Sequence, residues 1–303
     1  MAKIFLTGAS GNVGRPVLAE LLKRGHEVTA LVHRNSGLEG CKIVQGMVSE
    51  PAKYAGEVAA SEGVIHLAST RSVERGPVVK EDIWGTGVLL DSWRKGNFFY
   101  MSSQSVYGIP RGPLTEQHPL APMCWYDIAK ICGENQLAIE PARPGRGVGV
   151  AFRMALLFGP GGNGRGDQYL ETLYPHCAQG HVFAFENEEA METAGSSFVG
   201  PADLARAIVD SLELKTAGAY NISSGFCTWR QLLAPMCKKG GFPAPKFSLL
   251  SKLPQGAQYV RLPHSRSFVD ASRFCGLAGF APKQDLDELL DGFVRSQASR
   301  QRG

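Results

Sequence analysis

Tyr126 and Lys130 are the side chains of this chain whose types and spacing best suit proton transfer. They stand four residues apart in a segment, 126–140, that is predicted to be a helix, so their side chains share one helical face. An unperturbed tyrosine has a pKa near ~10, which is poor for proton transfer at neutral pH, and a neighbouring ammonium group lowers that pKa. The spacing therefore predicts a tyrosine acid/base supported by a lysine. The alternative is an ordinary amphipathic helix along which Lys130 extends its stem.

A glycine-rich turn near the N-terminus offers a binding site for an anion. Residues 3–7 form a short apolar run typical of a buried strand, and residues 15–25 place leucines on one helical face. Gly8, Gly11 and Gly14 lie between them. Side chains at these positions would block the tight turn, the approach of a pyrophosphate or the packing of helix on strand, and the anion would rest on backbone N–H groups. Strand, glycine turn and helix in this order favour a dinucleotide site over a simple turn.

The composition excludes several classes of protein. The 303 residues, 44% hydrophobic and 20% charged, suffice for one large α/β domain or for a nucleotide-binding domain with a smaller companion. A net charge of +4 is small and dispersed, so we expect no nucleic-acid partner. No apolar stretch is long enough to cross a bilayer, so we expect no membrane partner. Seven scattered cysteines without a CxxC pair indicate reduced thiols and a cytoplasmic location, and no residues have metal-ligand spacing.

Strands alternate with helices through the first half of the chain. After the first strand, the predicted strands cover 27–32, 42–45, 63–67, 97–102 and 147–153, and predicted helices cover 81–95 and 126–140. Strands separated by helices predict an α/β fold with a doubly wound parallel sheet of the Rossmann type. The expected NAD(P)-binding Rossmann domain spans 1–158, with 196–223 returning to it. Segments 159–195 and 224–303 then form a smaller, partly interleaved C-terminal substrate-binding lobe.

Further motifs follow the glycine turn nearly to the end of the chain. They are Thr7–Gly14, His66-Leu67-Ala68-Ser69, Gly85-Thr86, Ser102–Gly108, Tyr126 with Lys130, Phe158–Gly161, Phe198–Ala205, and Phe268–Asp270 with Leu277–Phe280. In this order they resemble the extended short-chain dehydrogenases/reductases, the family of NAD-dependent epimerases and dehydratases.

The resemblance implies a role for each matched residue. Tyr126 would exchange a proton with the substrate oxygen while hydride moves at the same carbon, Lys130 would hold the nicotinamide ribose, and Ser103 would hydrogen-bond the substrate carbonyl. The residues expected to bind the cofactor are Gly8, Ser10, Gly11, Asn12, Val13, Gly14, His33, Arg34, Met47, Val48, Leu67, Ala68, Ser69, Tyr126 and Lys130. His66 is expected to be a hydrogen-bonded histidine at the end of a buried strand rather than a catalyst or metal ligand.

Two departures from the family pattern concern the cofactor. Where NAD-binding relatives carry an acid for the ribose 2′-OH, the second strand ends in His33 and Arg34. A guanidinium suits a 2′-phosphate, so NADP(H) is the favoured cofactor, NAD(H) the second choice, and exposed surface cations the alternative interpretation. Met47 stands where relatives usually carry an Asp facing the adenine. Its presence leaves adenine recognition to backbone and apolar contacts.

Two further departures concern the substrate. Relatives that act on nucleotide-sugars place an Asn and an Arg where this chain has Leu156 and Ser196. Neither side chain can clamp a pyrophosphate as a guanidinium does. A third anchor, an Arg, could be Arg261 or Arg266, and Arg153, Arg165, Arg230 or Arg266 could supply the charge from another direction.

The leading hypothesis is an oxidoreductase that transfers hydride between NADPH and a carbonyl or alcohol carbon of a small molecule. The alternative is a nucleotide-sugar epimerase or dehydratase with tightly bound NAD. A third reading, a catalytically silent dinucleotide sensor, does not need Ser103, Tyr126 and Lys130. Helices at 81–95 and 126–140 occupy positions that pair in the dimers of relatives, so the resemblance allows a homodimer.

Overall fold

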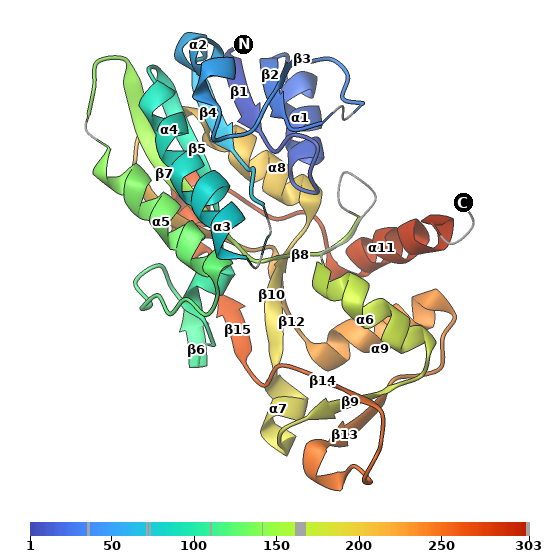
Figure 1. The fold of residues 1–303 in the computed structure, drawn as a ribbon. Coiled ribbons are helices and arrows are strands. Elements are labelled where there is room, and N and C mark those ends of the chain that lie inside the picture. Colours follow the sequence, from blue (N-terminus) through green and yellow to red (C-terminus); the bar gives the residue numbers. More distant parts are fainter. Residues whose placement is uncertain are drawn as a thin grey trace.

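The computed structural model describes residues 1–34, 37–70, 72, 74–109, 111–140, 142–160 and 168–300, with only the backbone of Arg111 and Gln168. Part of the expected turn after Phe158, from Gly161 onward, lies outside these residues, as does Arg165. The chain forms a larger lobe that contains the N-terminus and a smaller lobe built mainly from the second half (Figure 1).

A seven-stranded, fully parallel sheet forms the centre of the larger lobe. Its spatial order is β3 (Lys42–Gln45), β2 (Glu27–Val32), β1 (Lys3–Thr7), β4 (Gly63–His66), β5 (Gly96–Ser103), β7 (Arg146–Met154) and β11 (Gly218–Ile222). The order of successive strands reverses between β1 and β4, which is the topological switch point where α/β sheets bind ligands. The predicted α/β Rossmann fold is confirmed.

Helices cover both faces of this sheet. They are α1 (Gly14–Lys23), α2 (Ala55–Ala60), α3 (Arg75–Pro77), α4 (Gly85–Ser92), α5 (Trp125–Ile139), α8 (Pro201–Asp210) and α10 (Ser272–Ala278). Successive residues of β1 point to opposite faces, as the pleat requires. Leu6 therefore joins a core with Leu21 of α1 and Ile208 of α8, whereas Phe5 joins a separate core with Leu89 of α4.

One stretch of the predicted helix 81–95 has an unexpected form. Residues Val78–Trp84 make a π-helical turn between α3 and α4, and the helix ends at Ser92. A π-helical turn has i→i+5 hydrogen bonds and is frequent at functional sites. This turn buries Glu81 and Asp82, which are among the few acidic side chains almost shielded from solvent.

The smaller lobe holds two further sheets. One has the order β12 (Gly225–Thr228), β10 (Gly195–Val199), β15 (Arg266–Val269) and β6 (Arg111–Leu114), with β8 (Leu156–Leu157) beside β10. The other has the order β13 (Lys246–Leu249), β9 (Val182–Phe185) and β14 (Tyr259–Arg261). Helices α6 (Gln168–Ala178), α7 (Glu188–Thr193), α9 (Trp229–Gly240) and α11 (Leu286–Arg300) complete it.

The segment 196–223 divides between the two lobes. Helix α8 packs against α1, and β11 pairs with β7, so both belong with the seven-stranded sheet. Strand β10 instead pairs with β12 and β15 in the smaller lobe, which differs from the expectation for residues 196–199. The chain thus crosses between lobes at Gly200, where β10 ends and α8 begins.

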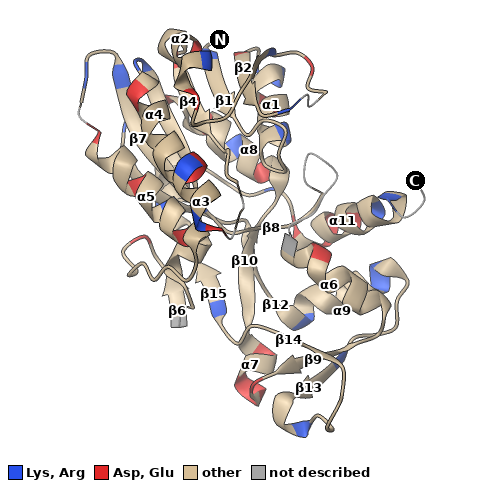
Figure 2. Cartoon of the chain, viewed as in Figure 1, with Lys and Arg blue, Asp and Glu red and all other residues tan. Residues whose placement is uncertain are grey.

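Charged residues of both signs are interspersed over the two lobes (Figure 2). All seven cysteines have free thiols. Within the described part of the chain, no helix is both long and apolar enough to span a membrane, and no three His, Cys, Asp or Glu side chains gather as a metal site.

Candidate functional site

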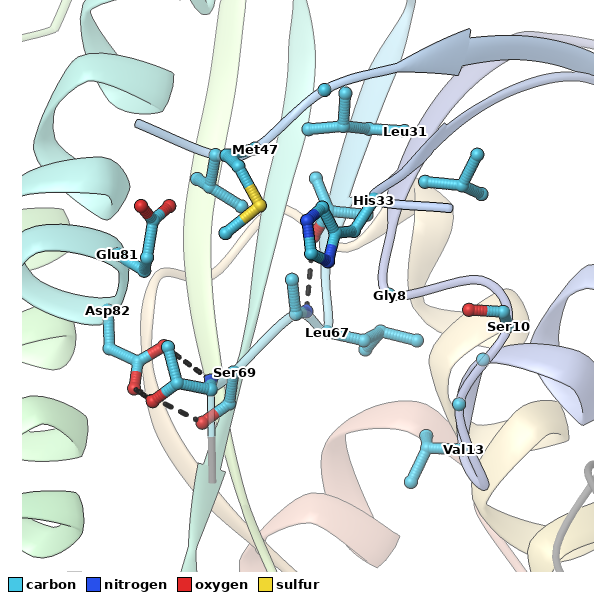
Figure 3. A pocket seen from close by; sticks show the side chains of 18 of the residues that line it. Gly8, Ser10, Val13, Leu31, His33, Met47, Leu67, Ser69, Glu81 and Asp82 are labelled. Atoms are coloured by element: carbon cyan, nitrogen blue, oxygen red, sulfur yellow. Dashed lines mark hydrogen bonds between the residues drawn. The ribbon is translucent and has the colours of Figure 1, made fainter. Parts of the chain in front are cut away.

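A cavity of about 410 Å³ opens at the carboxyl ends of β1, β2 and β4, which is within the roughly 300–1,000 Å³ typical of small-molecule sites (Figure 3). Its lining includes Gly8, Ser10, Gly11, Asn12, Val13, Gly14, His33, Met47, Val48, Leu67, Ala68 and Ser69, all predicted from the sequence. It also includes Thr7, Leu31, Val32, Gly46, Thr70, Glu81 and Asp82, which were not. Arg34, Tyr126 and Lys130 lie outside this lining.

The turn after β1 needs glycine at its first and third positions. Gly8 has a φ of +71°, and a Cβ there would lie 2.7 Å from the backbone nitrogen of Ala68. A Cβ on Gly14 would lie 2.0 Å from the carbonyl oxygen of Gly8. Because these two residues have no Cβ, the start of α1 can pack against the end of β1, as the spacing predicts. The N-terminus of α1 then lies beside the cavity.

His33 and Arg34 follow β2 directly. His33 lines the cavity, and the next residue, Arg34, is exposed to solvent. Among the lining residues that the structure describes, the acidic ones are Glu81 and Asp82, and both come from the π-helical turn rather than from the end of β2. The site therefore lacks the acid that NAD-binding relatives are expected to carry at the end of β2.

Asp82 fixes the loop after β4. Its carboxylate accepts hydrogen bonds from the backbone N–H and the hydroxyl of Thr70, at 2.8 and 2.6 Å, and a longer one from Ser69 at 3.5 Å. These bonds hold the wall of the cavity that leads away from the glycine turn (Figure 3). The position of Asp82, three residues before the Gly85-Thr86 motif, was the available sequence signal.

Lys130 brings α5 and β5 together. Its Nζ donates a hydrogen bond of 2.8 Å to the carbonyl oxygen of Met101 and lies 5.4 Å from the ring centroid of Tyr126 and 5.1 Å from that of Tyr100. The Lys130 side chain is buried, so its position is fixed by packing as well as by this bond. The predicted Tyr126–Lys130 pair therefore lies on the side of α5 that faces β5.

Ser103 ends β5, two residues after the carbonyl that binds Lys130. Its Oγ accepts a hydrogen bond of 3.1 Å from the backbone N–H of Ser105. A hydroxyl that accepts here keeps its own proton available for a second partner. Ser103, Tyr126 and Lys130 are thus carried by two elements, β5 and α5, that pack directly on each other.

A buried ion pair lies behind these residues. Arg153 of β7 donates to both carboxylate oxygens of Glu134 on α5, with the shortest bond at 2.6 Å, and also donates to the Tyr107 hydroxyl. Although burial alone lowers the pKa of Arg153, the hydrogen bond and charge of Glu134 raise it overall. Ser102 also donates to Glu134. Arg153 is therefore committed to this pair and does not supply a phosphate anchor.

His66 is hydrogen-bonded on both ring nitrogens, as expected. Nδ1 lies 2.7 Å from the Thr7 hydroxyl and Nε2 lies 3.0 Å from the Thr86 hydroxyl. Burial, with a smaller effect of the Lys130 charge, lowers the pKa of His66 to about 3. A neutral imidazole at physiological pH suits a structural link between β4, β1 and α4.

The two positions of the missing substrate anchors lie side by side in the sheet of β10. Leu156 of β8 pairs with Phe198, and Ser196 is buried two residues earlier. The Ser196 hydroxyl accepts a hydrogen bond of 3.0 Å from Gln104 Nε2 and donates to the carbonyl of Ser197. Neither position offers a cation. Arg230 pairs with Glu192, and Arg266 lies over the Phe226 ring.

Comparison with known proteins agrees with the motifs. A sequence model of the NAD-dependent epimerase/dehydratase family matches residues 4–223. The chain belongs to this family. One relative of this enzyme is a UDP-glucose 4-epimerase from Corynebacterium glutamicum, 27% identical over 269 residues that cover 80% of this chain and 82% of the relative.

Solved structures share the fold of this family member along its whole length. The Bordetella bronchiseptica enzyme WbmH in complex with NAD+ has a TM-score of 0.78 at 21% identity, covering 98% of both chains. The Thermotoga maritima UDP-glucose 4-epimerase with UDP-glucose has the same TM-score and identity, covering 99% of both. At this identity the likeness establishes the extended short-chain dehydrogenase/reductase fold.

Proposed function

We propose that this enzyme uses a nicotinamide dinucleotide to move hydride at an alcohol or carbonyl carbon of a small molecule, with Tyr126 as the acid/base. The observation that carries the proposal is the buried Lys130, which contacts the Tyr126 ring and anchors α5 to the end of β5. A silent sensor would not need this arrangement.

The cavity suits a dinucleotide. Gly8 and Gly14 let the turn pack closely, because a Cβ on either would collide with backbone atoms of Ala68 or Gly8, and the start of α1 offers backbone N–H groups to a pyrophosphate. His33 would face the adenosine ribose, and Ser69 the half that leads toward Tyr126. When bound, the dinucleotide supplies a nicotinamide that accepts or returns hydride.

Tyr126, Lys130 and Ser103 have different tasks in this proposal. Tyr126 gives a proton to the substrate oxygen or takes it away, because the nearby Lys130 ammonium favours its ionised form. Lys130 also holds the nicotinamide ribose. Ser103 accepts from Ser105 and donates its hydroxyl proton to the substrate oxygen, which fixes the orientation of the reacting carbon.

The comparisons favour the epimerase/dehydratase reading over the reductase reading. We therefore propose an internal oxidation and reduction in which NAD stays bound between turnovers. The protein as purified should release NAD when it is denatured, and chromatography of the supernatant identifies it. Absence of any retained dinucleotide, together with steady consumption of added NADPH by a carbonyl compound, would instead support the reductase.

The end of β2 favours the second candidate, an NADPH-dependent reductase. If Arg34 binds a 2′-phosphate, Arg34→Ala should raise the Kd of NADPH by about tenfold to a hundredfold and leave the Kd of NADH unchanged. The reason is that a charged hydrogen bond contributes roughly 1.5–3 kcal/mol. Fluorescence titration of both cofactors measures this, with Arg24→Ala as a control guanidinium engaged by Glu20 and Asp210. Tighter NADH than NADPH binding by the unchanged protein would contradict the NADP assignment.

We expect that the positions where nucleotide-sugar relatives carry an Asn and an Arg do not bind a substrate diphosphate in this chain. Because Leu156 and Ser196 supply no charge, we expect UDP and dTDP to bind with a Kd no better than about 1 mM, since a solvated anion gains little there. Isothermal titration calorimetry with UDP, UDP-glucose and dTDP-glucose tests this. Micromolar affinity for any of them would support a nucleotide-sugar epimerase or dehydratase, with the charge supplied from another direction by a residue such as Arg266.

A further inference from the structure

Gln104 connects the end of β5, in the larger lobe, to β10 in the smaller lobe (Figure 1). It follows Ser103, the proposed contact of the substrate oxygen, and begins the short 3₁₀-helical turn Gln104–Tyr107. Its side-chain amide donates a hydrogen bond of 3.0 Å to the hydroxyl of Ser196. Ser196 stands where nucleotide-sugar relatives are expected to carry an arginine. The residue at this anchor position is therefore bound by the immediate neighbour of the proposed catalytic serine.

The bond to Ser196 determines which end of the Gln104 amide remains available to a ligand. Ser196 uses its own proton in a hydrogen bond of 3.1 Å to the carbonyl oxygen of Ser197, so its hydroxyl oxygen can only accept from Gln104. The nitrogen Nε2 must then face Ser196, because an amide turned over would bring two acceptors together. The oxygen Oε1 therefore lies on the branch of the amide that does not bind Ser196.

The Oε1 atom of Gln104 is shielded from solvent and, among the described residues, has no hydrogen-bond partner. The hydroxyl of Ser105 is shielded and unpartnered in the same way. Native proteins pair nearly all of their buried polar atoms, so two such atoms beside a proposed reaction site indicate a ligand. Both residues are only half-buried as a whole, and the last torsion of glutamine is soft. A small turn of the amide therefore exposes Oε1 to a molecule held at Ser103.

The chemistry of this amide oxygen selects an uncharged partner. It accepts hydrogen bonds from O–H and N–H groups, and its partial negative charge repels a carboxylate or a phosphate. Ser196 is buried and brings no cation to the position of the missing arginine. An anion placed there would lose water without gaining a counter-charge. A second hydroxyl group, on the molecule that Ser103 and Tyr126 act on, meets the requirement of Gln104.

We propose that Gln104 accepts a hydrogen bond from a second hydroxyl group of the substrate, and that the enzyme acts on uncharged polyhydroxy compounds. This inference rests on the proposed function, because it requires a substrate at Ser103 and Tyr126. In the oxidation, the reacting carbon gives hydride to the nicotinamide, its hydroxyl gives a proton to Tyr126, and a carbonyl group results. The hydroxyl bound by Gln104 does not react. Ser196 acts as the positioning residue that aims the amide.

The test compares three alcohols as reductants of the dinucleotide, using the full chain as purified and supplied with NAD or, separately, with NADP. Cyclohexanol carries hydrogen beside the reacting carbon, trans-cyclohexane-1,2-diol carries a hydroxyl group, and trans-2-hydroxycyclohexanecarboxylate carries a carboxylate. Absorbance of the reduced nicotinamide gives kcat/KM for each alcohol. We expect the diol to exceed cyclohexanol by about fivefold to a hundredfold, because cyclohexanol leaves the buried amide oxygen unpaired. The carboxylate should be the poorest of the three.

Gln104→Met nearly keeps the length of the side chain and removes the oxygen, so the preference for the diol should fall to within about twofold. Ser196→Ala leaves the oxygen but no longer aims it, and it should lower the same preference. Because each preference compares alcohols on one preparation, a loss of folded protein cancels. Gln136→Met is the matched control, since the Gln136 amide on α5 donates to the carbonyl of Ile83, and this variant should keep the preference.

The outcomes separate the role of Gln104 from the proposed function. Equal values of kcat/KM for cyclohexanol and the diol, or an unchanged preference in Gln104→Met, would overturn the role of Gln104 alone. A higher value for the carboxylate than for the diol would overturn the uncharged substrate class. Reduction of neither dinucleotide by any of the three alcohols would overturn the proposed function and this inference with it.

Discussion

Replacing Tyr126 with phenylalanine is expected to lower kcat by about a hundredfold to ten-thousandfold while the Kd of the cofactor changes little. The substitution removes the transferable proton and leaves the ring that Lys130 contacts, and general acid–base catalysis contributes roughly that factor. Steady-state rates with an alcohol or carbonyl compound that the unchanged enzyme accepts give kcat, and fluorescence titration gives the Kd. Equal losses in kcat and kcat/KM would identify an interaction made only in the transition state.

Tyr100 provides the matched control for this experiment. Its ring lies 5.1 Å from the same Lys130 Nζ, but its buried hydroxyl donates to the carbonyl of Ala129. Tyr100→Phe should therefore keep kcat within about threefold, since a neutral internal hydrogen bond contributes only about 1 kcal/mol to stability. Near-normal turnover of Tyr126→Phe would show that another group moves the proton.

Local sequence patterns were sufficient to predict strands of the seven-stranded sheet. Residues 27–32 and 42–45 form β2 and β3 as predicted, because each is a short run that fits one strand between turn residues. Strand β6 was not predicted. Its Arg-Gly-Pro-Leu sequence carries no strand signal, and it is held by pairing with Arg266–Val269, which are distant in sequence. Such pairing depends on tertiary contacts rather than on propensity.

The candidate site likewise has residues that could be predicted from the sequence and residues that could not. The glycine turn was predictable because Gly8 and Gly14 satisfy backbone constraints that the sequence states directly. Glu81 and Asp82 were not, since an ordinary helical pattern does not indicate a π-helical turn that turns two successive acids toward a cavity. The role of Arg153 also depended on structure. The sequence allowed it to be a phosphate anchor, and only the packing of β7 against α5 reveals its partner.

Loss of the Arg153–Glu134 pair should produce the largest change in stability. Arg153→Met is expected to lower the free energy of unfolding by about 3–5 kcal/mol, because it leaves the buried Glu134 carboxylate without its cation. The Tyr107 hydroxyl would also lose the guanidinium that donates to it, whereas Ser102 would keep its bond to Glu134. Urea denaturation followed by circular dichroism measures the change, with Arg230→Met as a control because its pair with Glu192 is exposed.

The double variant Arg153→Met with Glu134→Leu separates charge burial from packing. Removing both charges ends the desolvation cost of the pair, so this variant should recover most of the stability lost by Arg153→Met. If the double variant is as unstable as the single one, the lost stability comes from the broken bonds that link Arg153 of β7 through Tyr107 to Asn221 of β11, and not from the unpaired carboxylate. A loss below about 1 kcal/mol in Arg153→Met would contradict the buried pair itself, since that is the range of exposed ion pairs. Ser102 precedes Ser103, and Glu134 lies one helical turn after Lys130. A recovered fold with reduced kcat would therefore show that this pair positions the two elements that carry the proposed catalytic residues.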